Sequence, residues 1–446
     1  MHPRALMTTA PSRRAVLGGM AAAGAMAVAP RRLSAQEAIT LRWWSPQSSP
    51  DQLAAYEAQI AAFEALHENV TVVFEKTSDE GYAPQLAAAF ASGAVPNVVT
   101  HLPSFATANY WANGLLEPFN DVIEMIGPDK FYPGTNDIYE IDPGQYAGTS
   151  IGNSAANMIW LRTDLMEKAG IAENPRTWDQ LLDAVARMQG GGIYGAPLPY
   201  GRNSMTSLVF IGVIHQAGGQ VFTPDLQVAI DSPETRDALE FYRAMREFCP
   251  PGATNYSWGE SLTAFVSGAC ATGIYTGRVL TNVADQNPAI ADVITCDTYP
   301  TKSADIAPWT FNDFPSVFIP KAASDMEATK QFAAFLFDAP GYIRQLHAAP
   351  GHVLPVLTTI SSDPAYLDNP IIQKYEAEVN LMSEAAANGF NLGRESAQHQ
   401  PNVKAGEVVN SDVIAEMVQR VILNDENVDQ VLGETTARIE EIMGQS

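Results

Sequence analysis

The sequence predicts an α/β protein built from two lobes that strand crossings join directly. Three observations predict this fold. Strands and helices alternate over residues 39–100, the same alternation resumes after residue 157, and no obvious flexible linker lies between the two stretches. We expect the first lobe to comprise residues 37–150 plus 310–354, and the second lobe residues 151–309 plus 355–446.

The first lobe is expected to open with a β-rich strand at residues 39–44, which stops at Ser45-Pro46. Ser49 then has the pattern of a helix N-cap, with Pro50 at the first helical position and Gln52 closing a capping box. The following elements are strands at 69–74 and 98–100 and a helix at 82–91. Such alternation predicts a parallel sheet with helices on both faces.

The second stretch begins with an expected strand at 158–161 and a helix at 163–169. Thr177 and Gln180 form a second capping box, which predicts a helix through Met188. Further helices are expected after Ser232-Pro233, at 328–337, and twice within 414–443.

The first 35 residues have the pattern of an export signal. Ser12-Arg13-Arg14-Ala15-Val16-Leu17 matches a twin-arginine motif, residues 18–29 are weakly apolar, and Ala35 suits a cleavage site. The apolar stretch is too short to span a bilayer. We expect periplasmic export by the twin-arginine route, without a lipid anchor because no Cys lies near the cleavage site. A disordered basic tail is the alternative.

Charge and cysteine content narrow the possible partners. Removing residues 1–35 removes five arginines and no acids, which leaves 21 basic and 50 acidic residues and a net charge of −29. Such a surface repels nucleic acid and anionic membranes, and we expect a monomer. Cys249, Cys270 and Cys296 have no metal-binding spacing; one disulfide and three buried thiols both remain open.

Several motifs occur together in a characteristic order. They lie at residues 67–72, 85–99, 114–121, 160–181, 265–271 and 351–355. Examples are Gly114-Leu115-Leu116-Glu117-Pro118-Phe119-Asn120-Asp121 and Phe265-Val266-Ser267-Gly268-Ala269. In this order they resemble the extracellular solute-binding proteins of ABC sugar importers, the group that contains maltose-binding protein. The resemblance spans the whole chain after the signal.

The resemblance implies the two-lobe periplasmic-binding-protein fold and a binding role rather than an enzymatic one. It implies that a carbohydrate, mono- or oligosaccharide, binds between the lobes and is delivered to the permease subunits of an ABC importer. No cofactor or metal is implied. Residues 146–151 lack the Pro and the aromatic residue of the family's crossing strand, and Asn153, Ser154 and Asn157 replace acidic contacts. Sugar identity therefore does not carry over, and a non-sugar polar solute is the alternative.

Two motifs point toward other chemistry. Gly148-Thr149-Ser150-Ile151-Gly152 satisfies the G-x-S-x-G pattern of a hydrolase nucleophile, but no helix pattern follows Ser150. Because the pattern is present, an exported polysaccharide hydrolase or lyase is a second alternative. Because no helix is expected after it, Ser150 fits a hinge strand better than a nucleophile. His347 and His352 do not have the spacing of a helical metal pair.

The solute is expected at the carboxyl ends of strands, between the lobes. Aromatic rings stack on sugar C–H surfaces, and planar polar side chains bind hydroxyl groups. The candidate residues are Trp43, Trp44, Ser45, Gln47, Asp79, Glu80, Tyr82, His101, Asn153, Arg202, Trp258, Tyr275, Arg278, Trp309, Asn312, Asp313 and His352. One of Trp43 and Trp44 must face the core. Trp309 is a candidate stacking surface. Arg202 and Arg278 either bind an acidic solute or pair with surface acids.

Overall fold

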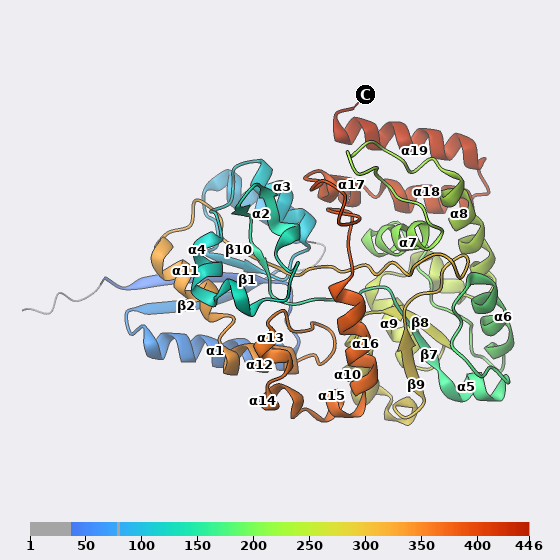
Figure 1. The fold of residues 1–446 in the computed structure, drawn as a ribbon, viewed down its shortest axis with the longest axis horizontal. Helices are drawn as coiled ribbons and strands as arrows, with labels where there is room; N and C mark the ends of the chain where they lie inside the picture. Colours follow the sequence, from blue (N-terminus) through green and yellow to red (C-terminus); the bar gives the residue numbers. More distant parts are fainter. Residues whose placement is uncertain (1–36, 78–80, 446) are drawn as a thin grey trace, which may run out of the picture. The chain divides into compact units, whose positions relative to one another are not determined.

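The computed structural model describes residues 37–77 and 81–445. The predicted export signal and the candidate residues Asp79 and Glu80 lie outside these ranges. Residues from Ala38 onward form one compact unit, and within it the strands build two separate larger sheets. The prediction of an α/β fold with two lobes is confirmed (Figure 1).

The first lobe contains a five-stranded sheet in the order β2-β1-β3-β10-β6. Its strands are β1 (Ile39–Ser45), β2 (Val70–Lys76), β3 (Val98–Thr100), β6 (Thr149–Ser150) and β10 (Ser316–Phe318). β1, β2 and β3 are parallel, whereas β10 runs antiparallel to β3 and β6. The carboxyl ends of β1, β2, β3 and β6 therefore lie at one edge of the sheet. A small hairpin of β4 (Glu140–Asp142) and β5 (Gln145–Tyr146) is separate.

Helices cover both faces of this sheet. They are α1 (Pro50–Leu66), α2 (Tyr82–Ser92), α3 (Ser104–Ala112), α4 (Asn120–Ile126), α11 (Met326–Phe335) and α12 (Ala339–His347). On one face Trp43 packs against Tyr56 of α1 and Phe332 of α11. The capping box of Ser49 and Gln52 forms as predicted.

The hydrophobic core of the first lobe continues beyond residue 354. Leu357, Ile360, Tyr366 and Ile372 belong to the same buried cluster as Trp43. They come from or flank the short helices α13 (Thr358–Ser361), α14 (Pro364–Leu367) and α15 (Pro370–Lys374). The chain therefore packs on the first lobe through three short helices beyond residue 354.

The second lobe is built on a three-stranded sheet in the order β8-β7-β9. Its strands are β7 (Met158–Arg162), β8 (Thr272–Tyr275) and β9 (Ile294–Asp297), and β7 is antiparallel to both neighbours. The second sheet is thus antiparallel. In the first sheet, by contrast, β1, β2 and β3 are parallel, as strand–helix alternation predicted there. β7 leads away from the crossing and β8 and β9 return toward it, because Met158 pairs with Tyr275 and Ile159 with Asp297.

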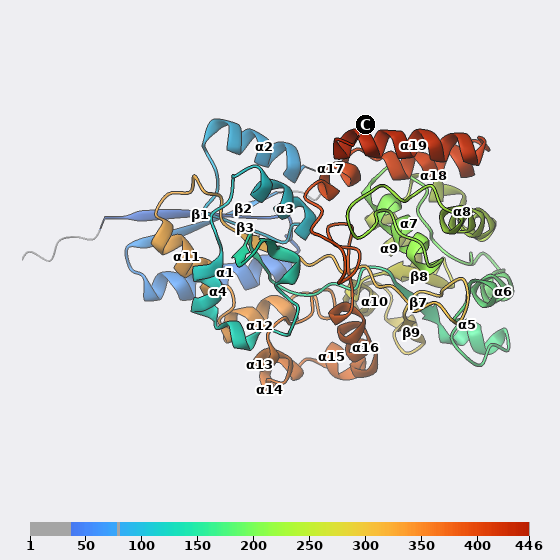
Figure 2. The ribbon, with the colours of Figure 1, turned by 45° about the horizontal axis from the view of Figure 1, so that its top comes forward.

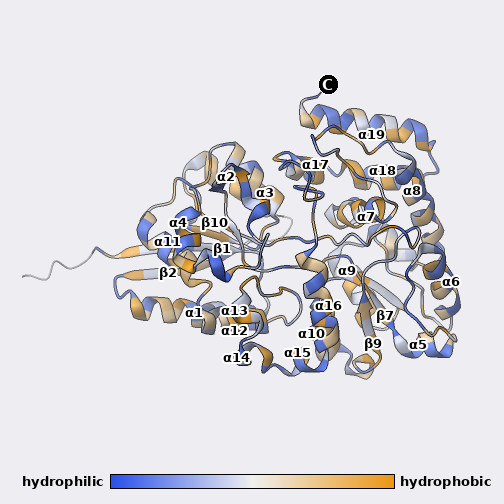
Figure 3. Cartoon of the chain, viewed as in Figure 1, coloured by the Kyte–Doolittle hydropathy of each residue, from blue (hydrophilic) through white to orange (hydrophobic). Residues whose placement is uncertain are grey.

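Helices surround the second sheet and supply most of this lobe's core. They are α5 (Thr163–Lys168), α6 (Trp178–Met188), α7 (Ser204–Gln216), α8 (Pro233–Arg246), α9 (Trp258–Val266), α10 (Arg278–Gln286), α16 (Glu376–Ala387), α17 (Ala405–Asn410), α18 (Val413–Ile422) and α19 (Val428–Met443). The Thr177–Gln180 capping box forms as predicted. Apolar and polar residues alternate along α19, as expected of an amphipathic helix (Figure 3). All three cysteines are buried and unpaired.

Three chain segments cross between the lobes side by side. Ala155 on the first segment forms a β-bridge with Asn312 on the second. Asn153, also on the first segment, forms a β-bridge with Leu354 on the third. Asn312 Nδ2 donates to Asn153 Oδ1 at 3.1 Å, and the Ser154 amide donates to Asn312 Oδ1 at 3.0 Å. Beyond the crossings, α17 lies beside α3 of the first lobe (Figure 2), where Asn109 Nδ2 donates to Glu407 Oε1 at 2.9 Å.

No helix within the described ranges is both long and apolar enough to cross a membrane.

Candidate functional site

Two strand ends of the first lobe bring candidate polar residues together. Ser45 ends β1 and His101 follows β3, and Ser45 Oγ lies 3.3 Å from His101 Nδ1. The same nitrogen lies 3.0 Å from Thr100 Oγ1. The amide of Gln47 donates to Ser45 Oγ at 3.2 Å, so the loop after β1 folds back onto this point.

The second lobe and the third crossing reach the same region. Arg278 is the first residue of α10, and its amide donates to Thr276 Oγ1 at 3.2 Å. Thr276 Oγ1 in turn lies 3.0 Å from His352 Nδ1 on the third crossing. We call Ser45, His101, Thr276, Arg278 and His352 the strand-end cluster.

The backbones of the two lobes touch beside this cluster. A Cβ atom added to Gly277 would lie 2.1 Å from the carbonyl oxygen of Gly351. No side chain fits in that space, so glycine at 277 is required by the close approach of the two segments. The contact keeps Thr276 and His352 within hydrogen-bonding distance.

Both histidines of the cluster are neutral near pH 7. Burial lowers the pKa of His101 to about 4. Burial, the nearby Arg278 guanidinium and then His101 lower the pKa of His352 well below its ordinary value. When the neighbouring hydroxyl groups donate to each Nδ1, the ring proton resides on Nε2, which becomes a donor.

A small cavity of about 20 Å³ adjoins the two histidines. Tyr56 of α1 and Gln52 also line it, and Gln52 Nε2 donates to Gln47 Oε1 at 2.8 Å. The volume suits about one water molecule. The candidate residues Ser45, Gln47, His101, Arg278 and His352 are thus brought together.

An aromatic pair lies at the carboxyl end of β8. The rings of Trp258 and Tyr275 meet edge to face, with centroids 5.7 Å apart and an interplanar angle of 81°. Trp258 is half-buried and Tyr275 is buried, so only the tryptophan offers substantial ring surface.

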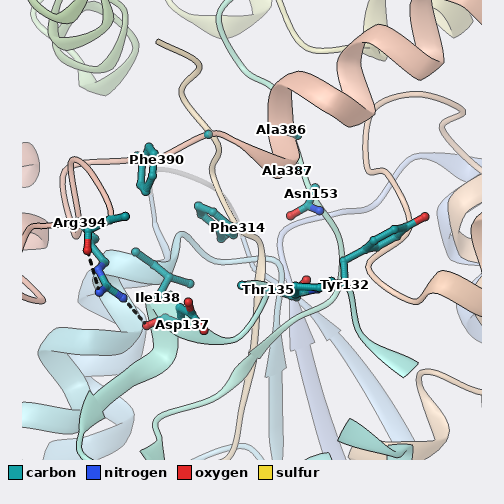
Figure 4. Close-up of a pocket in the computed structure, with 14 residues that line it drawn as sticks. Tyr132, Thr135, Asp137, Ile138, Asn153, Phe314, Ala386, Ala387, Phe390 and Arg394 are labelled. Carbon is teal, nitrogen blue, oxygen red and sulfur yellow. Dashed lines mark hydrogen bonds between the residues drawn. The ribbon is translucent and has the colours of Figure 1, made fainter. Parts of the chain in front are cut away.

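A larger cavity of about 220 Å³ lies at the crossings (Figure 4). Tyr132, Asn153, Phe314, Phe390 and Arg394 are among the residues that line it, and Asn153 is the one candidate residue there. The Arg394 guanidinium donates to the carbonyl of Asp137 across the cavity rim at 3.2 Å. Segments 132–138 and 386–397, which carry no recognisable motif, form most of this cavity, so sequence reasoning missed it.

Other candidate residues are not members of the strand-end cluster. Trp43 is fully buried and donates from Nε1 to Thr100 Oγ1 at 2.9 Å, so it packs in the core. Trp44 lies on the other face of the sheet and donates to Glu75 at 2.6 Å. Tyr82 is buried in α2, and the buried Asn312 and half-buried Asp313 lie on the second crossing. Arg202 is exposed and pairs with Glu416 at 3.2 Å.

Trp309 makes a stack inside the second lobe. Its ring lies parallel to that of His215, with centroids 4.1 Å apart, and its Nε1 donates to the carbonyl of Glu395 at 3.0 Å. The carboxylate of Glu395 lies 2.8 Å from His215 Nε2 and is buried. One ring face of Trp309 is therefore already covered by a protein side chain.

Ser150 has no arrangement that would activate it. Its side chain is fully buried in β6 and donates to backbone carbonyls of Gly152 and Pro315. A nucleophilic serine needs a base within hydrogen-bonding reach, and none of the described histidines is bonded to it. Over the described residues, no group of three or more metal-ligating side chains gathers.

A protein-family model matches this chain. The model of the bacterial extracellular solute-binding protein family matches residues 47–343. YcjN of Escherichia coli (strain K12), named as a periplasmic-binding protein of an ABC transporter, is 23% identical over 91% of this chain and 93% of its own length. A mannitol-binding protein of Pseudomonas aeruginosa is 27% identical over 52% of this chain and 54% of its own length.

Solved structures share the fold at low sequence identity. Maltose-bound MalE3 of T. maritima has a TM-score of 0.78 and 19% identity, covering 91% of this chain and all of that chain. A solute-binding protein from Agrobacterium radiobacter K84 in complex with ribitol has a TM-score of 0.75 and 18% identity, covering 91% and 99%. These likenesses extend over both lobes.

Proposed function

This chain belongs to the bacterial extracellular solute-binding proteins, and from that premise we propose that it binds a carbohydrate between its lobes for an ABC importer. The observation that carries the proposal is the strand-end cluster. Side chains from β1, β3, the β8–α10 turn and the third crossing meet at one point between two sheets. Relatives named for maltose, ribitol and mannitol support a carbohydrate or polyol.

The polar residues of the cluster suit hydroxyl recognition. Ser45, Thr276 and the two neutral histidines offer donors and acceptors that are held by neighbouring groups rather than by long flexible chains. Trp258 provides half-exposed ring surface for the C–H face of a sugar. We include Trp309, whose ring stacks on His215, and Asn153 of the first crossing among the proposed solute contacts.

We infer binding without chemistry as the normal activity. Ser150, the one residue in a nucleophile-like motif, is buried and its hydroxyl group is engaged by backbone carbonyls. Closure of the lobes around the solute then presents a surface to the membrane permease subunits. Export to the periplasm by the twin-arginine route, a monomeric state, and lobe boundaries near 150, 310 and 354–372 complete the proposal.

A binding screen tests the function. The purified mature chain is heated with neutral monosaccharides, disaccharides, sugar acids and polyols, and with amino acids as the non-sugar arm. A cognate solute at 100 times its dissociation constant adds about 2.7 kcal/mol to the free energy of unfolding. Calorimetry should then show one solute per chain, and mass spectrometry should recover the solute unaltered. Stabilisation by amino acids alone would refute the carbohydrate, and a converted solute would refute binding without chemistry.

A further inference from the structure

The strand-end cluster is basic or neutral in a strongly acidic protein. The chain has 50 acidic and 26 basic residues, yet every side chain of the cluster is an alcohol, a histidine or an arginine. Burial, Arg278 and His101 lower the pKa of His352, and no carboxylate contributes to this shift. Burial alone accounts for the shift of His101.

Arg278 differs from Arg42 and Arg202, whose guanidinium groups form ion pairs with acidic side chains. Arg42 pairs with Glu75 at 2.7 Å, and Arg202, the other candidate cation, pairs with Glu416 at 3.2 Å. Arg278 is half-buried as a residue, and no described residue forms an ion pair or hydrogen bond with its guanidinium. A guanidinium that is partly removed from water without a counter-charge loses hydration that nothing in these residues replaces.

Each of the two neutral histidines can donate a hydrogen bond to an anion bound at Arg278. Nδ1 of His101 is within reach of Ser45 and Thr100, and Nδ1 of His352 is within reach of Thr276. Hydroxyl donation to these atoms leaves an Nε2–H donor on each neutral ring. A planar guanidinium binds a carboxylate through two parallel hydrogen bonds, which a point charge cannot do.

We propose that the solute is a sugar that carries a carboxylate, such as a uronic acid, and that Arg278 binds this carboxylate with His101 and His352 as additional donors. The proposal rests on the proposed function and deepens it by naming the substrate class. The same charge logic excludes Arg202 from this role, because its guanidinium already has acidic partners.

Calorimetry with paired sugars tests the substrate class. Galacturonate and glucuronate, and their dimers, are compared with galactose, glucose and the corresponding neutral disaccharides at equal ionic strength. We expect a sugar acid to bind at least tenfold more tightly than its neutral counterpart. Equal or tighter binding of the neutral sugars would overturn the inference and leave the proposed function intact. If no sugar of either kind binds, both fail.

A set of arginine variants tests the residue. Arg278→Gln should weaken the sugar acid at least tenfold and change the neutral counterpart less than threefold, whereas Arg278→Lys should retain part of the preference. Arg344→Gln removes the same charge from an exposed residue of α12 and is the matched control. Equal losses for the acidic and neutral sugars in Arg278→Gln, or an unchanged acid affinity, would overturn the assignment. Thermal midpoints without solute show that each variant is folded.

Discussion

At the scale of single residues, position after a strand was the informative signal. Ser45 and His101 were predicted because they follow strands, and Arg278 because the resemblance places ligand contacts near it; the structure brings all three together with His352. Trp309 shows the limit of such reasoning, since its stacking partner His215 and its acceptor Glu395 lie far along the chain in opposite directions. Nothing local to Trp309 encodes those partners. The 220 Å³ cavity was missed for the same reason.

His101 should make stability depend on pH. In the folded chain its pKa is about 4, whereas an unfolded histidine takes up a proton near pH 6.5. The unfolded state therefore binds more protons between pH 6.5 and 4, and the free energy of unfolding falls as pH decreases through that window. At about 1.36 kcal/mol per pKa unit, a pKa that falls from 6.5 to about 4 would correspond to about 3.4 kcal/mol. Because His101 is only half-buried, we expect a loss on the order of 1 kcal/mol.

Denaturant unfolding at pH 7, 5.5 and 4.5 measures this loss. The variant His101→Gln has no titrating ring, so its stability should decline less than that of the natural sequence over the same range. Parallel declines in the two proteins would show that other groups control the acid sensitivity.

At the scale of helices and strands, local signals were reliable and pairing partners were not. The capping boxes at Ser49 and Thr177 form as predicted, because their hydrogen bonds involve residues three positions apart. The antiparallel order of β8-β7-β9 was not predicted, since five α-helices, α5 to α9, separate β7 from β8 along the chain. Alternation in sequence does not encode the direction in which a distant strand returns.

Removing the cap at Thr177 should destabilise the second lobe. Thr177 Oγ1 accepts from the amide of Gln180, and Trp178 stacks on Phe241 with ring centroids 4.3 Å apart. Thr177→Ala leaves that amide without its acceptor and should cost about 1 kcal/mol in denaturant unfolding. Thr177→Ser keeps the hydroxyl group and should lie within a few tenths of a kcal/mol of the natural sequence. Equal losses in both variants would assign the effect to the threonine methyl group.

At the scale of the whole molecule, the ordered motifs predicted two lobes, and packing refined where they divide. A strand crossing ends one sheet but does not end the hydrophobic core, and Ile360, Tyr366 and Ile372 still belong to the first lobe's core. The sequence does not predict this packing, because these residues follow a crossing segment, where a lobe boundary is expected. The solute itself is the part that motifs do not encode.

Export is the remaining whole-molecule prediction. Changing both Arg13 and Arg14 to Lys should leave the full-length precursor in the cytoplasm, because the paired guanidinium groups define the twin-arginine signal. Cell fractionation and immunoblotting distinguish the precursor from a mature chain that begins near Gln36. Arg4→Lys is the control and should be exported. A mature periplasmic product from the double variant would contradict this route.

The antiparallel second sheet also bears on how such a protein can diversify. Because β8 returns toward the first lobe, the turn that follows it carries Thr276 and Arg278 of the proposed solute site, while the strand itself is buried in the second lobe. In the proposed site, the residues of this turn are therefore distinct from the strand residues that form the core of the second lobe. A lineage could change Thr276 and Arg278, and with them the preferred solute, while keeping Gly277 and the buried strands of the scaffold.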